Sequence, residues 1–208
     1  MTQDTPEGVL KPQLWVERTV EETQAVYTEW AKSYEAEVSA RGYHTPRRIA
    51  EALAAHLPAG DGPILDFGCG TGLSGIALRS AGISALHGTD INAAMVNEAR
   101  PKGIYETLWV SEPGVLDISH GPYRAIVATG VISLGAAPPE TLDILIDALD
   151  PGALVALSYN DPTLAHGGFD ANLDGHIEAN QLELLFREHG PHLDDVNMGS
   201  DVIVLKRL

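Results

Sequence analysis

The sequence predicts an α/β fold: a doubly wound, mainly parallel sheet that ends in an antiparallel hairpin. Short apolar stretches alternate with helical patterns along the chain, which is typical of a sheet covered by helices on both faces. A glycine-rich turn directly follows the first of these stretches, and two late extended stretches meet around Gly199 and Ser200. We expect a seven-stranded sheet with strands near residues 63–67, 84–90, 105–111, 123–129, 153–159, 192–198 and 201–207.

Length, charge and cysteine content narrow the classes of protein to which the chain can belong. Its 208 residues suit one domain, which we expect to span residues 1–208. Lys and Arg number 13 against 29 Asp and Glu, and the resulting net charge of −16 repels nucleic-acid phosphates. Cys69 is the single cysteine, and no apolar run approaches the roughly 18 residues of a membrane span. We therefore expect a cytoplasmic protein without nucleic acid or membrane as partner, and the oligomeric state stays open.

Two helices are expected before the glycine-rich turn. Thr19 and Glu22 have the spacing of a capping box, in which each side chain bonds the backbone amide of the other residue. The helix that follows carries an apolar stripe at helical spacing and is expected to end at Gly42. A second helix is expected to begin at Thr45, because Pro46 suits a first helical turn.

The most informative stretch is residues 64–72, which read ILDFGCGTG. The pattern predicts a short apolar strand, a sharp turn, and a helix that begins at about Leu73. Glycine tolerates a left-handed backbone and lets a ligand approach where a Cβ would collide. The start of the helix adds unpaired N–H groups and the positive end of the helix dipole. We therefore expect this turn to hold a nucleotide-like ligand.

Two nucleotide-binding patterns overlap in this turn, and they differ in where the strand ends. Residues 70–75 match the G-x-G-x-x-G pattern of dinucleotide sites, but that register buries Asp66 and puts Gly68 inside a strand. The alternative register ends the strand at Phe67, so that Asp66 faces the crevice at the carboxyl edge of the sheet. We favour this second register, and an Asp66 sealed in the interior would count against it.

A second acid indicates a ribose in either register. The expected strand 84–90 ends in Asp90, which lies 20 residues beyond Gly70. A carboxylate in this place can accept hydrogen bonds from both ribose hydroxyls. Asp90 therefore predicts a nucleoside without distinguishing a dinucleotide from another adenosine compound. Asn92, two residues later, is a good N-cap for the helix that follows.

In the second register, residues 64–72 resemble motif I of the class I S-adenosylmethionine-dependent methyltransferases. Residues 27–35, which read YTEWAKSYE, resemble the entry helix of small-molecule methyltransferases, and the chain looks similar to the Williams–Beuren-region methyltransferase-like group. The resemblance implies a Rossmann-like methyltransferase fold, with S-adenosylmethionine as cofactor and S-adenosylhomocysteine as product. It also implies an enzyme that transfers a methyl group to a small-molecule acceptor. The alternatives are a non-catalytic S-adenosylmethionine-binding module and an NAD-dependent oxidoreductase.

The resemblance further implies roles for individual residues. Residues 15–58 would form a helical lid over the cofactor. Asp66 would meet the amino group of the cofactor, Asp90 its ribose, and Ile91 its adenine. The residues implied to bind the cofactor are Tyr34, Asp66, Gly68, Cys69, Gly70, Gly72, Asp90, Ile91, Glu112 and Thr129.

Two of the implied roles have alternatives, and the catalytic residue is not identified. Asp117 competes with Glu112 for the adenine amino group, and both acids could equally be solvated. Tyr34, Tyr159 and His166 are candidates for a general base only by their expected position at the carboxyl edge of the sheet.

Two features late in the chain raise the question of a metal. Residues 170–178 fit the first positions of an EF-hand calcium loop, but Gln181 stands where the loop needs a bidentate Glu. His189 and His192 are separated by Gly-Pro, which does not place them on one face of a helix. We therefore expect no metal site, and we interpret residues 173–186 as a helix with an apolar face.

Overall fold

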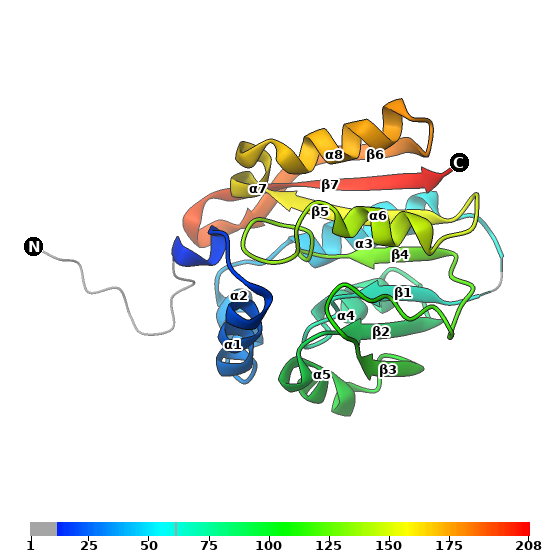
Figure 1. The fold of residues 1–208 in the computed structure, drawn as a ribbon. Helices are drawn as coiled ribbons and strands as arrows, with labels where there is room; N and C mark the ends of the chain where they lie inside the picture. Colours follow the sequence, from blue (N-terminus) through cyan, green and yellow to red (C-terminus); the bar gives the residue numbers. More distant parts are fainter. Residues whose placement is uncertain (1–11, 61) are drawn as a thin grey trace, which may run out of the picture.

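The computed structural model describes residues 12–60 and 62–208. Within these residues, seven strands form one sheet in the order β3-β2-β1-β4-β5-β7-β6 (Figure 1). Neighbouring strands are parallel from β3 to β5, whereas β7 is antiparallel to both β5 and β6. The strands are β1 (Ile64–Phe67), β2 (Leu86–Asp90), β3 (Thr107–Val110), β4 (Ala125–Ala128), β5 (Leu154–Asn160), β6 (Leu182–Leu193) and β7 (Met198–Arg207). The predicted fold class is confirmed.

Helices cover both faces of the sheet (Figure 1). The α-helices are α1 (Val20–Trp30), α2 (Tyr34–Ala40), α3 (Thr45–His56), α4 (Leu73–Ser80), α5 (Ala93–Ala99), α6 (Thr141–Asp147), α7 (Asp161–His166) and α8 (Gly168–Glu178). Three 3-10 helices are η1 (Pro12–Trp15), η2 (Arg100–Lys102) and η3 (Asp194–Val196). None of the helices in the described part of the chain is long and apolar enough to span a membrane.

The core lies in two layers, one on each face of the sheet, because successive strand residues point to opposite sides. Leu65 packs in the layer under α6 and α8, while its neighbour Ile64 packs in the layer under α3 and α4. The central strand β4 is apolar throughout, and β5 is apolar from Leu154 to Leu157, as expected of parallel strands covered on both faces. This arrangement leaves the carboxyl ends of β1, β2 and β4 as the open edge where polar residues gather.

The N-terminal region contains two helices where the sequence predicted one running to Gly42. The capping box is confirmed: Thr19 N donates to Glu22 Oε2 at 2.9 Å, and Glu22 N donates to Thr19 Oγ1 at 3.2 Å. Helix α1 nevertheless ends at Trp30, and α2 restarts at Tyr34 after a turn. Across this turn the rings of Trp30 and Tyr34 meet edge to face, with 4.7 Å between their centroids.

The secondary structure of the C-terminal region differs most from the prediction. Residues 182–186, interpreted as part of a helix, begin the long strand β6, and the expected strand 192–198 covers only the end of it. Helix α8 ends at Glu178, and Asn180 adopts a left-handed conformation with φ of 55°, a common way to end a helix.

A β-bulge explains why this strand was misread as helical. The pairing of β6 with β7 shifts by one residue between Leu184 and Phe186. A bulge places two residues opposite one, so the apolar residues lose the alternation that marks a strand. The turn of the hairpin is also displaced: η3 and Asn197 form it, whereas Gly199 and Ser200 lie inside β7.

Candidate functional site

The glycine-rich turn after β1 has the predicted conformation, although its glycines serve different purposes. Gly68, Gly70 and Gly72 all have positive φ, of 68°, 53° and 98°. A Cβ at Gly68 would collide with Val131, and one at Gly72 would lie 3.1 Å from Ile104 Cδ1. Only Gly70 faces open space, with no described atom within 4 Å of where its Cβ would be. Gly70 therefore leaves room for a ligand, whereas packed side chains fill the space at Gly68 and Gly72. That the three glycines bind the cofactor stays a prediction.

Asp90 ends β2 beside this turn, as predicted. Its Oδ2 accepts a hydrogen bond from Gly70 N at 2.8 Å, and its Oδ1 accepts one from Asn92 N at 2.8 Å. Burial raises the pKa of the Asp90 carboxyl, and these two amide donors oppose the rise. Because each carboxylate oxygen has two lone pairs, each can accept one further hydrogen bond from a ligand. Asn92 caps α5 by accepting from the amides of Ala94 and Met95.

Asp66 does not lie open in a crevice, and that expectation was wrong. Strand β1 ends at Phe67 as predicted, but the Asp66 side chain is fully buried. Its Oδ2 accepts hydrogen bonds from Ser74 Oγ and Tyr105 Oη, each at 2.6 Å. Burial raises the pKa of the carboxyl to about 6, and the two hydroxyl donors limit the rise. These hydroxyls replace water around the carboxylate, which is why burial at the end of the strand is compatible with this register.

Tyr105 also accounts for the dinucleotide-like spacing of the glycines. A Cβ at Gly75 would lie 2.5 Å from Tyr105 Oη, and one at Gly88 would lie 2.9 Å from Tyr105 Cδ1. The last glycine of the G-x-G-x-x-G pattern therefore makes room for a tyrosine ring. The sequence analysis missed this tyrosine, and the two glycines that accept its ring were the available signal.

A small hollow lies at the glycine turn, and two of its lining residues, Thr71 and Thr129, have buried hydroxyls without a partner among the described residues. It is lined by residues 68–71, Leu73, Ser74 and Thr129, and also by Tyr34, Tyr43 and Pro46. Within the described residues, Thr71 Oγ1, Thr129 Oγ1 and Asp66 Oδ1 are buried without a hydrogen-bond partner. An unsatisfied buried polar atom costs about 1–3 kcal/mol. A polar ligand in the hollow would relieve that cost.

Cys69 lines the same hollow but has the character of a packing residue. Its side chain is buried, and its backbone N donates to Thr89 O at 2.9 Å. Burial, with Asp66 and Asp90 nearby, raises the pKa of the thiol well above its ordinary value. The thiol therefore stays protonated and is a poor nucleophile.

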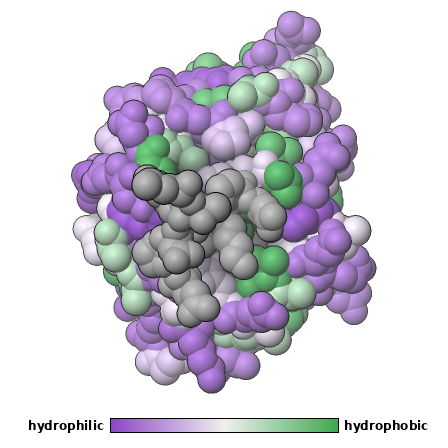
Figure 2. All heavy atoms as spheres, turned by 90° about the vertical axis from the view of Figure 1, so that its left-hand side faces the viewer, coloured by the Kyte–Doolittle hydropathy of each residue, from purple (hydrophilic) through white to green (hydrophobic). Residues whose placement is uncertain are grey.

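Helices α1 and α2 lie beside the carboxyl ends of the parallel strands (Figure 1). Lys102 Nζ donates to Thr71 O at 2.6 Å and forms an ion pair with Glu35 of α2, so it ties that helix to the glycine turn. Asn92 Nδ2 donates to Gln24 O at 2.9 Å, which ties α1 to the loop after β2. Figure 2 shows this side of the molecule, where hydrophilic residues surround a few separate apolar patches.

The remaining predicted residues are less closely associated with the hollow. The backbone O of Ile91 accepts a hydrogen bond from Gln24 Nε2 at 3.0 Å, next to Asp90. Glu112 is exposed, and so is Asp117, whose Oδ1 accepts from Ser119 N at 2.8 Å. Whether either acid meets an adenine stays a prediction.

The three candidate bases have unfavourable surroundings. The Tyr159 side chain is fully buried and packs against Phe169, with 5.8 Å between ring centroids. His166 also packs its ring against Phe169, at 5.5 Å. Tyr34 lines the hollow, but burial raises the pKa of its phenol well above the ordinary value, so the phenolate is scarce near neutral pH.

The possible metal ligands do not converge. Residues 170–178 belong to helix α8, so their carboxylates do not surround a loop. His189 bonds Asp201 through Nδ1, whereas His192 bonds Thr45. Among the described residues there is no group of three or more His, Cys, Asp or Glu side chains arranged to hold a metal ion.

Together, an open α/β sheet, a glycine turn at its carboxyl edge and an acid at the next strand end define a nucleoside-binding type of site. A methyltransferase-domain family model matches residues 40–197, which is more than half of the chain. The chain therefore belongs to the methyltransferase domain family, and the class I resemblance of its motif is confirmed at this level.

Individual relatives agree with the family. Human methyltransferase-like protein 27 is 34% identical over 139 residues, which are 64% of this chain and 55% of that protein. The chain thus spans about half the length of this relative.

Two solved structures share the fold at 18% identity. One is magnesium protoporphyrin IX methyltransferase from Synechocystis with bound S-adenosylmethionine, with a TM-score of 0.65 over 92% of this chain and all of that one. The other is a methyltransferase in complex with the Haloferax volcanii activator Trm112, with a TM-score of 0.67 over 89% and 97%.

We predict that Asp66→Asn changes how stability depends on pH. Folding holds the Asp66 pKa at about 6, above its ordinary value of 3.8, so the folded state favours the protonated carboxyl. This contribution to stability is full below about pH 4 and is lost as pH rises to about 6, by up to about 3 kcal/mol in the wild type. The variant lacks this loss, so its unfolding free energy relative to wild type should rise across that interval in urea denaturation.

The exposed Asp174 of α8 provides the control, because Asp174→Asn also removes a carboxylate but from the surface. A difference between Asp66→Asn and wild type that is constant from pH 4 to 7 would show that the fold does not favour the protonated carboxyl.

We predict that Lys102→Met loosens the two N-terminal helices. The variant loses the links from Nζ to Thr71 O and Glu35, which at this partly exposed place are worth about 1 kcal/mol. Amide hydrogen exchange in residues 20–40 should therefore become about fivefold faster, while exchange in α8 is unchanged.

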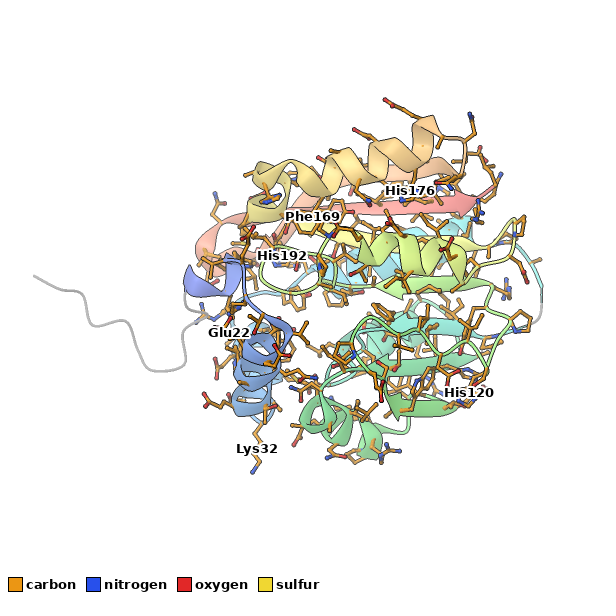
Figure 3. The ribbon with its side chains drawn as sticks, viewed as in Figure 1. Glu22, Lys32, His120, Phe169, His176 and His192 are labelled. Atoms are coloured by element: carbon orange, nitrogen blue, oxygen red, sulfur yellow. The ribbon has the colours of Figure 1, made fainter. Side chains whose placement is uncertain are left out.

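Lys32→Met is the matched control, since Lys32 lies between the same two helices and points away from the molecule (Figure 3). Equal exchange rates in the two variants would mean that Lys102 does not hold the helices.

Proposed function

We propose that the protein is an S-adenosylmethionine-dependent methyltransferase that moves a methyl group to a small-molecule acceptor. The observation that carries the proposal is the glycine turn of a methyltransferase-family chain with Asp90 bonded to Gly70 beside unpartnered buried polar atoms. The bound S-adenosylmethionine in the Synechocystis relative supports the same cofactor.

The residues around the hollow fit this cofactor. Asp90 has acceptor capacity left for ribose hydroxyls, and Asp66 Oδ1, which has no partner within residues 12–60 and 62–208, suits an ammonium group. Gly70 leaves room for the part of the cofactor that would join its ribose to its amino group. Ile91, which directly follows Asp90, is the proposed adenine contact. Glu112 or Asp117 remains the proposed partner of the adenine amino group.

When bound, the cofactor supplies an electrophilic methyl group on a sulfonium, so the protein needs chiefly to orient the acceptor and exclude water. We propose that residues 15–58 act as the lid that does this. Tyr34 of α2 and Pro46 of α3 line the hollow, and α3 is fixed in the core by its fully buried Ile49 and Leu53. No step in this proposal needs a strong base.

A small-molecule acceptor is supported by a neighbouring space and by charge. A second hollow adjoins the first, and Tyr34 and Tyr43 line both of them. The net charge of −16 opposes nucleic acid as acceptor. We also propose that the protein is cytoplasmic and that its partners include neither a membrane nor nucleic acid.

We predict that S-adenosylmethionine and S-adenosylhomocysteine both bind the folded protein in calorimetry. We also predict that Asp90→Ala lowers the affinity for S-adenosylhomocysteine by about tenfold or more. The alanine loses charge-assisted hydrogen bonds worth about 1.5–3 kcal/mol. Asp90→Asn keeps one acceptor oxygen, so it should lose less.

If neither compound gives a heat of binding, in a sample shown to be folded, the proposed methyltransferase function would be excluded. A change of NADH fluorescence on adding the protein would instead support the oxidoreductase alternative.

We predict that S-adenosylhomocysteine binds more tightly as pH rises from 5 to 7. An ammonium group needs the ionised Asp66 carboxylate, whose pKa in the folded protein is about 6. Below that pH the carboxyl must first lose its proton, so affinity should fall by up to about tenfold per pH unit. The slope should disappear in Asp66→Asn, and a flat wild-type profile would refute the contact between Asp66 and the amino group.

A further inference from the structure

The second hollow has an aromatic and uncharged wall. Five of its lining residues are aromatic: Trp15, Tyr27, Trp30, Tyr34 and Tyr43. Its lining, taken over the described residues, includes no Lys, Arg, Asp or Glu. Tyr34 and Tyr43 also line the hollow at the glycine turn, so the two spaces share a wall. A ligand in the second hollow would therefore lie next to a ligand in the first.

The rings present both faces and edges to this space. Tyr27 and Trp30 are stacked, with 6.0 Å between centroids and 29° between planes, and Trp30 meets Tyr34 edge to face. A flat aromatic compound can add to such a cluster by stacking or edge contacts, each worth about 0.5–1.5 kcal/mol beyond its burial. No lining residue offers a cation to a carboxylate, and Arg18, behind the lining, already donates through Nη2 to the backbone oxygens of Leu14 and Gly135. A carboxylate would therefore leave water at a cost.

His192 supplies a polar point on this wall. It lies near the end of β6, towards the side of the molecule that carries α1 and α2 (Figure 3), and it packs edge to face against Tyr43 at 5.2 Å. The side chain is only 7% exposed. Its Nε2 has no hydrogen-bond partner within the described part of the chain, whereas Nδ1 lies 2.8 Å from Thr45 Oγ1.

A chain of hydrogen bonds orients the imidazole from behind. Arg48 Nη1 donates to Ser200 Oγ at 3.1 Å, and Ser200 Oγ lies 3.0 Å from Thr45 Oγ1. A guanidinium can only donate, so Ser200 accepts from it and its own proton is free for Thr45. The Thr45 proton is then free for His192 Nδ1, which leaves the imidazole proton on Nε2.

The imidazole is also uncharged. Burial, opposed by Asp161 and assisted by Arg48, lowers the pKa of His192 to about 4. Near neutral pH the ring is therefore a neutral Nε2–H donor. It is too weak a base to remove a proton from a phenol, so its role is to orient a ligand.

From this geometry we infer that the aromatic hollow is the acceptor site and takes an uncharged aromatic compound with a hydrogen-bond-accepting oxygen. His192 is the positioning residue, and its Nε2–H donates to that oxygen. The inference rests on the proposed methyltransferase function, because it assigns the acceptor class of the same site.

The test uses three compounds that share one ring system and differ in charge. With the protein saturated with S-adenosylhomocysteine, 2-naphthol, 2-naphthoate and a naphthylmethylammonium salt are titrated by ligand-observed NMR. We expect 2-naphthol to bind at least tenfold more tightly than either charged compound. Equal or tighter binding of the carboxylate would overturn the inference, and preference for the ammonium salt would overturn it in favour of a cation–π cage.

Variants of two histidines test the positioning role. His192→Phe keeps a ring in place and removes the hydrogen-bond donor. It should therefore lower the affinity for 2-naphthol by about five- to tenfold, as one lost hydrogen bond implies. S-adenosylhomocysteine affinity should change less than twofold. The exposed His120 lies far from His192 (Figure 3), and His120→Phe should change neither affinity. Unchanged 2-naphthol binding in His192→Phe would overturn the role of His192.

A measurement on the wild-type protein does not depend on any variant folding. Long-range ¹H–¹⁵N spectra of the imidazole nitrogens should show the neutral Nε2–H tautomer of His192 at pH 7, and an Nδ1–H tautomer or a cation would overturn the inference. If S-adenosylhomocysteine itself fails to bind, the proposed function is wrong. If it binds but 2-naphthol does not, only the assignment of the acceptor is wrong.

Discussion

The hydrogen bond from Gly70 N to the Asp90 carboxylate is the constraint on which the rest of the site depends. It joins the turn after β1 to the end of β2, and the other oxygen of the same carboxylate holds Asn92 N. Asn92 in turn caps α5 and bonds α1 through Gln24 O. One carboxylate therefore fixes the glycine turn and, through its neighbour, the start of the N-terminal cover. A ligand that bonds Asp90 would meet a preorganised surface, which reduces the ordering that binding requires.

Asp66 shows how such a site gives up stability for binding. Burial raises its pKa to about 6, and one carboxylate oxygen has no partner within the described residues, so the unliganded fold holds a group in an unfavourable state. Local violations of the usual rules are expected at functional sites. In the proposed function, the amino group of the cofactor would pair with the unpartnered oxygen of Asp66. The same residue would then lower the stability of the free protein and raise its affinity for the cofactor.

Local signals in the sequence were sufficient for much of the fold and for part of the site. The strand, turn and helix at 64–73, the acid at the end of β2 and the capping box at Thr19 each depend on neighbouring residues, and all were predicted. The burial of Asp66 depends on Tyr105, 39 residues away, and on two glycines that make room for its ring. The strand β6 was misread because its bulge breaks the alternation of apolar residues. His192 was considered only as a metal ligand, because the hydrogen-bond chain that orients it runs through Thr45 of α3 and Ser200 of β7, both far away in the sequence.

A crystal structure of the protein with S-adenosylhomocysteine would test the central claim most directly. The account predicts the ribose hydroxyls on Asp90, the amino group at Asp66 Oδ1, and the glycine turn in the conformation described above. A ligand bound elsewhere, or a ribose that leaves Asp90 bonded only to Gly70 and Asn92, would contradict it.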